Sequence, residues 1–546
     1  MTTPADPGLA TKDREHVPAA TRSARTRPDH PPVQTLLWQA ALLGLSGDAL
    51  LRDGPPGPGL AIWVAVLSLA ALSLVWSAGR RVSTEAVIWL AIAVLLASCL
   101  AWRDAGALRF LDLVATMGAL GLAGIALRDP AQAITAPRLR DTLWAGLAIV
   151  LATARGIVPL ALRELFSGDR RAGAIGRART TLRLTLIVTA LLLVFGSLLR
   201  SADPIFASLV SLPDLDVATI VSHVFLIGFC AWIAGGWAYG ALVESPTLRR
   251  APDRFPIALG MLDLTAALVT LTVLFAAYVL TQLGWFFGGE RFLHATTGLT
   301  AAQYARQGFF QMVWVVALVV PLLLATRASL APEPALARRH TVLSLPIVGL
   351  LAAMIASAAL RMRLYVQYYG LTTERLYALV FMGWLAIVLA LLAATVLRGR
   401  GRPFVAGSVV AGLTLLIGLH VAVPDLIVAR LNIARVDTAT YHLDLPYLAS
   451  LSGDAVPLAV RATLAPPSER ERRDPFDADA RCAAASLLLR EWGPASRTLA
   501  RRQELGAWRS WNSGEARALT AVGERSAELR RLRHATCKPG RNDDSH

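Results

Sequence analysis

The stretch RMRLYVQYYGLTTER, residues 361–375, joins two long apolar segments, 341–360 and 376–397. Tyr and Arg suit the boundary of a bilayer, because each side chain has an apolar body and a polar tip. We therefore expect Arg361, Tyr365 and Tyr369 to lie where a spanning helix leaves the hydrocarbon. Gly370 is expected to end that helix with a positive φ, and Thr372 to cap the next helix. The stretch predicts a helix–turn–helix connection between two membrane spans.

Composition extends this prediction to most of the chain. The 546 residues are 55% hydrophobic and 17% charged, with a mean hydropathy of +0.51, whereas soluble chains carry about 25% charged residues. Apolar runs recur along the first four-fifths, and in lipid a helix satisfies its own backbone amides. The expected fold is all-α: a polytopic transmembrane helical bundle of 11–12 spans with a small C-terminal helical extracytoplasmic domain.

Three regions follow from the distribution of apolar residues. Residues 1–33 are polar and read as a disordered tail, 34–423 as a multi-span membrane domain, and 424–546 as a mostly helical extracytoplasmic region. The twelve apolar stretches lie near 35–51, 59–78, 86–102, 106–127, 142–163, 181–199, 217–243, 256–283, 307–326, 342–361, 374–397 and 404–423. Segment 142–163 contains Arg155 and Pro159 and is the candidate for a re-entrant segment. Eleven spans with the N-terminus inside are preferred to twelve with both ends outside.

Loop arginines predict the orientation. The links 163–183, 244–255, 327–341 and 398–403 each hold three or more arginines, whereas the alternating links hold one or two. Basic loops face the cytoplasm, so the region after 423 is expected outside a bacterial cytoplasmic (inner) membrane. The net charge of +16 is explained by these loops, and nucleic-acid binding is not expected.

Three motifs carry a family resemblance. They are Arg361-Met362 with Tyr369-Gly370-Leu371-Thr372 and Arg375, the upstream element from Tyr304 and Arg306 to Phe310, and the downstream element with Asp444, Tyr447 and Asp454-Ala455-Val456-Pro457. Together they resemble a bacterial integral-membrane family, domain of unknown function 4173. The resemblance implies a membrane protein and no particular activity.

The spans contain few ionisable residues. Arg109 and Asp112 lie three apart on one face of an apolar helix, Asp263 lies in segment 256–283, and Arg155 lies in segment 142–163. Charge in lipid is costly and is usually paired or functional. Each of these candidates therefore has two interpretations, a structural role near the membrane boundary or a role in a polar cavity.

The sequence lacks nucleophile-elbow, phosphate-loop, zinc-protease and dinucleotide motifs. No catalytic residue, metal site or cofactor is expected, and the weight of the sequence is against an enzyme. Cys482 and Cys537 flank two expected helices, 478–491 and 513–534, and are a candidate disulfide if the region is extracytoplasmic. Trp492, Trp508 and Trp511 are expected to pack between these helices.

Arg375 would oppose the dipole of its own helix. We therefore hypothesise that Arg375 or Arg306 pairs with Asp444 or Asp454 and fixes the C-terminal region onto the membrane domain.

Three functions remain open. The first is a non-enzymatic envelope component that binds a small molecule, lipid or envelope protein at its outer face, besides the lipid bilayer. The second is a secondary transporter or channel, which requires a polar cavity at mid-depth. The third is an envelope glycan or lipid transferase, which requires a carboxylate such as Asp203 beside an outer cleft.

Overall fold

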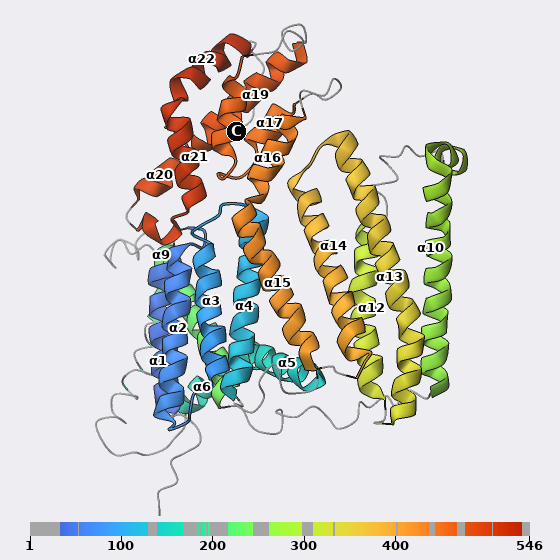
Figure 1. Cartoon of the computed structure of the whole chain (residues 1–546). Helices are drawn as coiled ribbons and strands as arrows, with labels where there is room; N and C mark the ends of the chain where they lie inside the picture. The colour runs from blue at the N-terminus through green and yellow to red at the C-terminus, as the bar shows by residue number, and fades with distance from the viewer. Residues whose placement is uncertain are drawn as a thin grey trace, which may run out of the picture.

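The computed structural model describes residues 33–52, 54–128, 139–166, 217–243, 261–297, 309–330, 333–399, 402–435, 443–466, 475–504 and 506–537, with a few single positions between 181 and 196. These residues form helices joined by short connections (Figure 1). The chain is a multi-pass membrane protein with an all-α fold, as its composition predicted.

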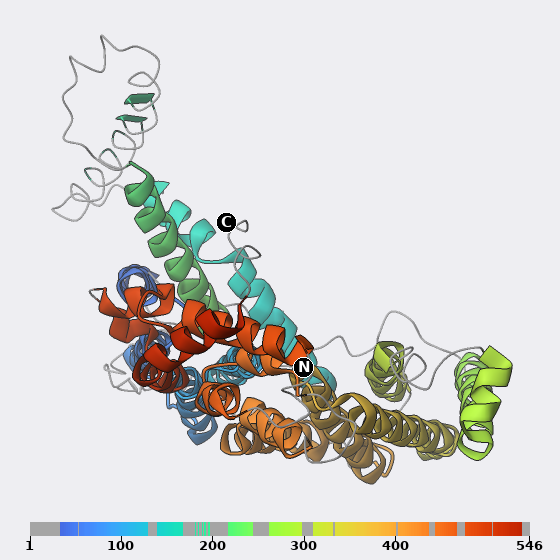
Figure 2. The same ribbon diagram turned by 90° about the horizontal axis from the view of Figure 1, so that it is seen from above.

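Two groups of membrane helices have separate apolar cores. The first group consists of α1 (Val33–Leu51), α2 (Pro58–Ser77), α3 (Thr84–Cys99), α4 (Gly106–Arg128), α9 (Val217–Leu242) and α15 (Arg402–Ala422). The second group consists of α10 (Met261–Thr297), α12 (Phe309–Ser329), α13 (Pro334–Tyr369), α14 (Thr373–Leu391) and the π-helical turn η2 (Leu392–Val396). Seen from above, α10 and α12 lie far from the first group (Figure 2).

Seven described helices are long and apolar enough to cross a membrane: 58–77, 106–128, 218–242, 262–281, 334–367, 373–396 and 403–422. Each falls on an expected apolar stretch. Three shorter apolar helices, 84–99, 146–155 and 314–327, fall on others. α1 covers 35–51, and most of 181–199 lies outside the described residues.

Segment 142–163 is interrupted. α5 (Leu139–Arg155) ends where Gly156 adopts φ 66°, and α6 (Val158–Phe166) follows. A side chain at Gly156 would meet the Trp232 indole at 1.9 Å, so both the backbone and the packing require glycine. α5 lies across the end of the first group rather than upright within it (Figures 1 and 2).

The C-terminal region, residues 424–537, forms a third group with its own apolar core. It contains α16 (Pro424–Ala434), α17 (Leu445–Ala449), α18 (Val456–Leu464), α19 (Pro475–Trp492), α20 (Arg497–Gln503), the 3-10 turn η4 (Ala507–Ser510), α21 (Ser513–Glu524) and α22 (Ser526–Thr536). It covers one end of the first group (Figures 1 and 2), which we call the docking end.

The expected helix 478–491 is present as α19, whereas 513–534 breaks at Arg525 into α21 and α22. Trp492 packs against the C-terminal core as expected. The same expectation was wrong for Trp508 and Trp511, which are 52% and 44% exposed.

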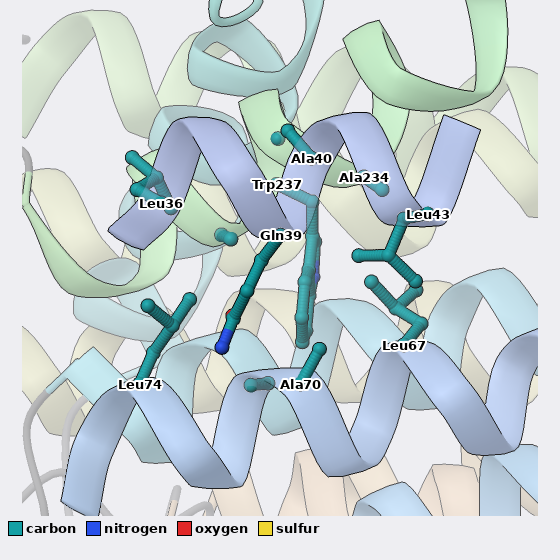
Figure 3. Close-up of a pocket in the computed structure, with 12 residues that line it drawn as sticks. Leu36, Gln39, Ala40, Leu43, Leu67, Ala70, Leu74, Ala234 and Trp237 are labelled. Carbon is teal, nitrogen blue, oxygen red and sulfur yellow. The ribbon is translucent and has the colours of Figure 1, made fainter. Parts of the chain in front are cut away.

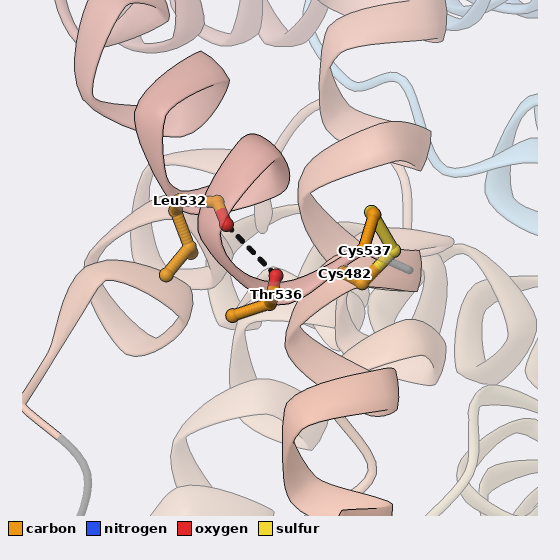
Figure 4. The surroundings of a disulfide bond; sticks show 4 residues. All are labelled: Cys482, Leu532, Thr536 and Cys537. Atoms are coloured by element: carbon orange, nitrogen blue, oxygen red, sulfur yellow. Dashed lines mark hydrogen bonds between the residues drawn. A yellow bond between two sulfur atoms is a disulfide. The ribbon is translucent and has the colours of Figure 1, made fainter. Parts of the chain in front are cut away.

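Cys482 of α19 and Cys537, just after α22, are joined in a disulfide with their Cα atoms 5.2 Å apart (Figure 4). The two helices also pack against each other, and each contributes a fully buried leucine to the C-terminal core, Leu488 and Leu529. The candidate pairing from the sequence is therefore the pairing that the structure contains.

Candidate functional site

Two aspartates, Asp104 and Asp454, join the C-terminal region to the connection between α3 and α4. We call this pair the clasp. The Asp104 amide donates to Asp454 Oδ2 at 2.9 Å, and the Gly453 amide donates to Asp104 Oδ2 at 2.8 Å. The Asp454 side chain is 1% exposed and also meets Arg103 at 3.6 Å and Arg517 at 2.6 Å. Two segments far apart in the sequence are thus joined by charge-assisted hydrogen bonds, which are among the stronger ones in proteins.

The end of α3 is capped from the C-terminal region. The last carbonyls of a helix have no partner within the helix. The side-chain amide of Asn512 donates to the carbonyls of Leu100 and Arg103, at 2.9 and 2.7 Å. The backbone amide of Ser513 donates to the Ala101 carbonyl. The Asn512 oxygen meanwhile accepts from Gly514 and so caps α21. One side chain therefore orders the ends of two helices.

Below this junction lies a buried acid–histidine pair. His420 Nε2 of α15 is 3.2 Å from Asp112 Oδ2 of α4, and their side chains are 3% and 0% exposed. Arg103 links the pair to the junction, because its Nε donates to the His420 carbonyl at 2.9 Å. A chain of polar groups therefore runs from inside the first group to Arg517, whose side chain is half exposed.

A second junction joins the turn after α13 to the C-terminal region. Asn432 of α16 accepts from the Leu371 amide at 2.9 Å and donates to the Leu371 carbonyl at 2.7 Å. Thr373 donates from its amide to the Tyr447 hydroxyl and from its own hydroxyl to Asp425. The central motif and the downstream motif of the sequence therefore meet here.

Asp425 extends this junction to the clasp, since its second oxygen accepts from the Ser452 amide at 3.2 Å. Arg435 donates to the carbonyls of Val366 and Gln367 near the end of α13. We call the two junctions together the docking network.

Burial sets the electrostatics of the clasp. Desolvation raises the pKa of Asp104 to about 6, with nearby Glu515 and Asp454 adding to the rise. The Gly453 amide and Arg109, 3.4 Å away, act in the opposite direction. Asp104 therefore titrates near neutrality in the middle of the docking network.

The turn itself confirms the expectation for 361–375. Gly370 ends α13 with φ 81°, and the Thr372 hydroxyl accepts from the Arg375 amide at 3.4 Å. Tyr369 is 54% exposed and its ring lies 5.0 Å from that of Tyr365. Arg361, in contrast, is buried in α13 with Ser357 nearby.

The hypothesis that Arg375 pairs with Asp444 or Asp454 was wrong. Arg375 stacks over the Tyr365 ring at 4.1 Å and donates to the carbonyls of Tyr369 and Gly370. It therefore compensates the negative end of α13 instead of needing a carboxylate at the start of α14. Asp444 caps α17 by accepting from the Tyr447 amide at 2.9 Å. Asp454 does fix the C-terminal region, but through Arg103.

The four ionisable candidates of the membrane domain lie at separate places. Arg109 pairs with Asp104 and donates to the Pro56 carbonyl, whereas Asp112 faces His420. The two residues therefore have different partners. Asp263 is exposed in the first turn of α10, and Arg155 is exposed in the last turn of α5. Both places suit the charge, because acids favour helix N-termini and bases favour C-termini. Tyr304 and Arg306 lie outside the described residues.

A small cavity of about 10 Å³ lies between α1, α2 and α9, away from the docking network (Figure 3). Its walls are mainly apolar, with Leu36, Leu67 and Trp237 among them, and Gln39 points along one side. A cavity of this volume accommodates one water molecule at most.

Several residues of the docking network were missed from the sequence alone. Asn512 was detectable, since Asn followed three residues later by Glu515 is a helix-start pattern. Asp104 and Asp425 gave no such signal, because a single acid in a connection is usually solvated. Their partners lie hundreds or tens of residues away, and only the fold brings them together.

Comparison with known proteins gives a family but no activity. No curated protein and no solved structure matches the chain. A family model described as "Domain of unknown function (DUF4153)" matches residues 90–462, more than half of the chain. The match spans the α3–α4 connection, the central motif and both aspartates of the clasp. The resemblance to domain of unknown function 4173 is thereby corrected, and the chain belongs to the family of domain of unknown function 4153.

Proposed function

We propose that this protein is a non-enzymatic component of the bacterial cell envelope that binds a partner molecule beside the docking end, at the turn between α13 and α14. The binding surface is the one formed by Tyr365, Tyr369 and Arg375 beside the C-terminal region. Exposed aromatic rings with a stacked guanidinium are enriched at binding surfaces, because they offer large contact area at low entropic cost.

One observation carries this proposal: three aspartates of the docking network hold separate segments of the chain together. Asp104, Asp425 and Asp454 each accept from backbone amides or side chains of another segment. Buried groups satisfied in this way hold a surface rigid. A rigid surface is what binding requires, since fewer degrees of freedom are lost on association.

The proposal places the docking end outside the cytoplasmic membrane. Among the described residues, the basic connection between α12 and α13 and the basic segment after η2 lie at the opposite end (Figure 1), and basic loops prefer the cytoplasm. The Cys482–Cys537 bond also supports it, because disulfides persist in oxidising compartments.

The test is photo-crosslinking in living cells. A benzophenone amino acid replaces Tyr369, which is 54% exposed, and the matched control replaces Leu371, which is 5% exposed. We expect a discrete adduct of protein or soluble ligand at position 369 and none at position 371. Adducts with phospholipid alone would identify position 369 as part of the aromatic belt and would contradict the proposal.

The buried Asp112–His420 pair favours transport as a second candidate function, because ionisable pairs inside membrane bundles mark proton pathways. In vesicles containing the purified protein and a pH-sensitive dye, this function predicts proton flux that Asp112→Asn abolishes. Equal flux in Asp112→Asn and in wild type would exclude it.

A further inference from the structure

Tryptophans mark two levels along the first group of helices. Trp38, near the start of α1, is 71% exposed, and Trp76, near the end of α2, is 84% exposed. The two lie at the same end, since Gln39 donates to Ser73 at 2.8 Å. Tryptophan gathers at both membrane–water interfaces, so these residues indicate one boundary of the hydrocarbon.

The opposite boundary lies one helix length away. α2 has 20 residues, which at 1.5 Å per residue spans about 30 Å, the thickness of a bilayer core. Along it Ile62, Val66 and Leu69 are 42%, 37% and 66% exposed, as a lipid-facing side requires. The second boundary therefore falls near Pro58, where α2 begins.

The C-terminal region reaches this level. A Cβ at Gly57 would lie 2.9 Å from the Arg509 carbonyl, and one at Gly54 would lie 2.9 Å from Ser510 Cβ. η4 therefore rests directly on the connection between α1 and α2. Trp508 lies in η4 and Trp511 follows it directly, and these are the exposed tryptophans that do not pack within the C-terminal core.

Trp102 lies at the same level. Its carbonyl accepts from the Ser513 hydroxyl, two residues beyond Trp511, and its side chain is 46% exposed. Trp102 packs against His420 and Arg103, so Trp508 and Trp511 are the two indoles at this level that the C-terminal region adds.

We propose that η4 with Trp508 and Trp511 is a membrane-interface anchor, which inserts these indoles into the headgroup layer of the surrounding bilayer. Lipid is the occupant that fits, because η4 rests on the connection where α2 begins, at the level of the second boundary of the hydrocarbon. An indole suits this layer, with its ring toward the acyl chains and its N–H toward water. The C-terminal region then lies against the bilayer, and this holds whichever side of the membrane it faces.

The test is tryptophan quenching in the full-length protein. Wild type and Trp508→Phe/Trp511→Phe are reconstituted in phosphatidylcholine vesicles, with and without lipid brominated on the acyl chain near the glycerol. The fluorescence difference between the two proteins is the contribution of these indoles. We expect wild type to fluoresce more strongly than the double variant in plain vesicles. In vesicles of brominated lipid we expect this difference in fluorescence to be lost.

The matched control is Trp492→Phe, which removes an indole of the C-terminal core. Its contribution should persist in brominated vesicles. If the double variant does not fold, the single variants Trp508→Phe and Trp511→Phe give the same measurement one indole at a time. A contribution that survives bromination and is quenched by aqueous iodide would overturn the proposal.

Discussion

Removing the Asp454 carboxylate should release the strongest constraint on the C-terminal region. In Asp454→Ala, Arg103 loses its buried partner and the Asp104 amide loses its acceptor. Breaking a buried pair costs about 3–5 kcal/mol, because an uncompensated charge is left behind. Arg103→Ala should cost less, about 2 kcal/mol, since Arg517 still faces Asp454 at 2.6 Å.

The assay is reversible unfolding in mixed micelles by titration with SDS. The double variant Arg103→Ala/Asp454→Ala should cost less than the sum of the single variants, by about 1–3 kcal/mol, because the two side chains share one interaction. The control pair, Arg490 and Glu491, is 71% and 54% exposed, and its removal should cost about 1 kcal/mol or less. Strict additivity for Arg103 and Asp454, or a cost for Asp454→Ala as small as the control, would refute the reasoning.

Three further predictions concern single features. Asp104 has a pKa raised to about 6 from 3.8, so its contribution to stability is full below the lower value and is lost as pH rises through the upper one. The stability of Asp104→Asn relative to wild type should therefore increase across that window, by up to about 3 kcal/mol, and a pH-independent difference would contradict this. Cys482→Ser should lower stability by about 2–4 kcal/mol, because Cys537 then no longer closes a 55-residue separation; dithiothreitol should lower wild-type stability similarly and leave the variant unchanged. Gly370→Ala should cost about 1–3 kcal/mol, since φ 81° with ψ 171° is accessible almost only to glycine, whereas Gly118→Ala in α4, with open space around it, should be neutral or stabilising by thermal unfolding.

Local chemistry made much of the fold predictable. Apolar runs near the length of a bilayer crossing located the long helices, and the Gly370–Thr372 pair located one turn to the residue. These features depend on neighbours in the sequence, so the sequence contains the information. The break at Gly156 was anticipated only in part, from Arg155 and Pro159, because the packing of Trp232 against Gly156 is a tertiary contact.

The docking network was predictable in kind but not in its partners. A carboxylate that folds back onto the membrane domain needs a cation nearby, and an arginine was the right type. From the sequence we chose Arg375, because its charge opposes the dipole of its own helix. That charge is instead compensated by the Tyr369 and Gly370 carbonyls at the end of the preceding helix. Arg103 was the true partner, 351 positions away from Asp454, and no periodicity or spacing connects two such distant residues.

The most direct test of the central claim, that the C-terminal region is fixed on the docking end, is a cysteine cross-link between Gly54 and Ser510. A Cβ at Gly54 lies within 2.9 Å of Ser510 Cβ, close enough for a disulfide after a small shift. In a background with Cys99 and Cys230 replaced by alanine, Gly54→Cys/Ser510→Cys should cross-link almost completely under mild oxidation in the membrane. The control, Gly54→Cys/Gly523→Cys, should not, because a side chain at position 523 meets nothing within 4 Å. Equal cross-linking of the two pairs, or none in either, would contradict a fixed C-terminal region.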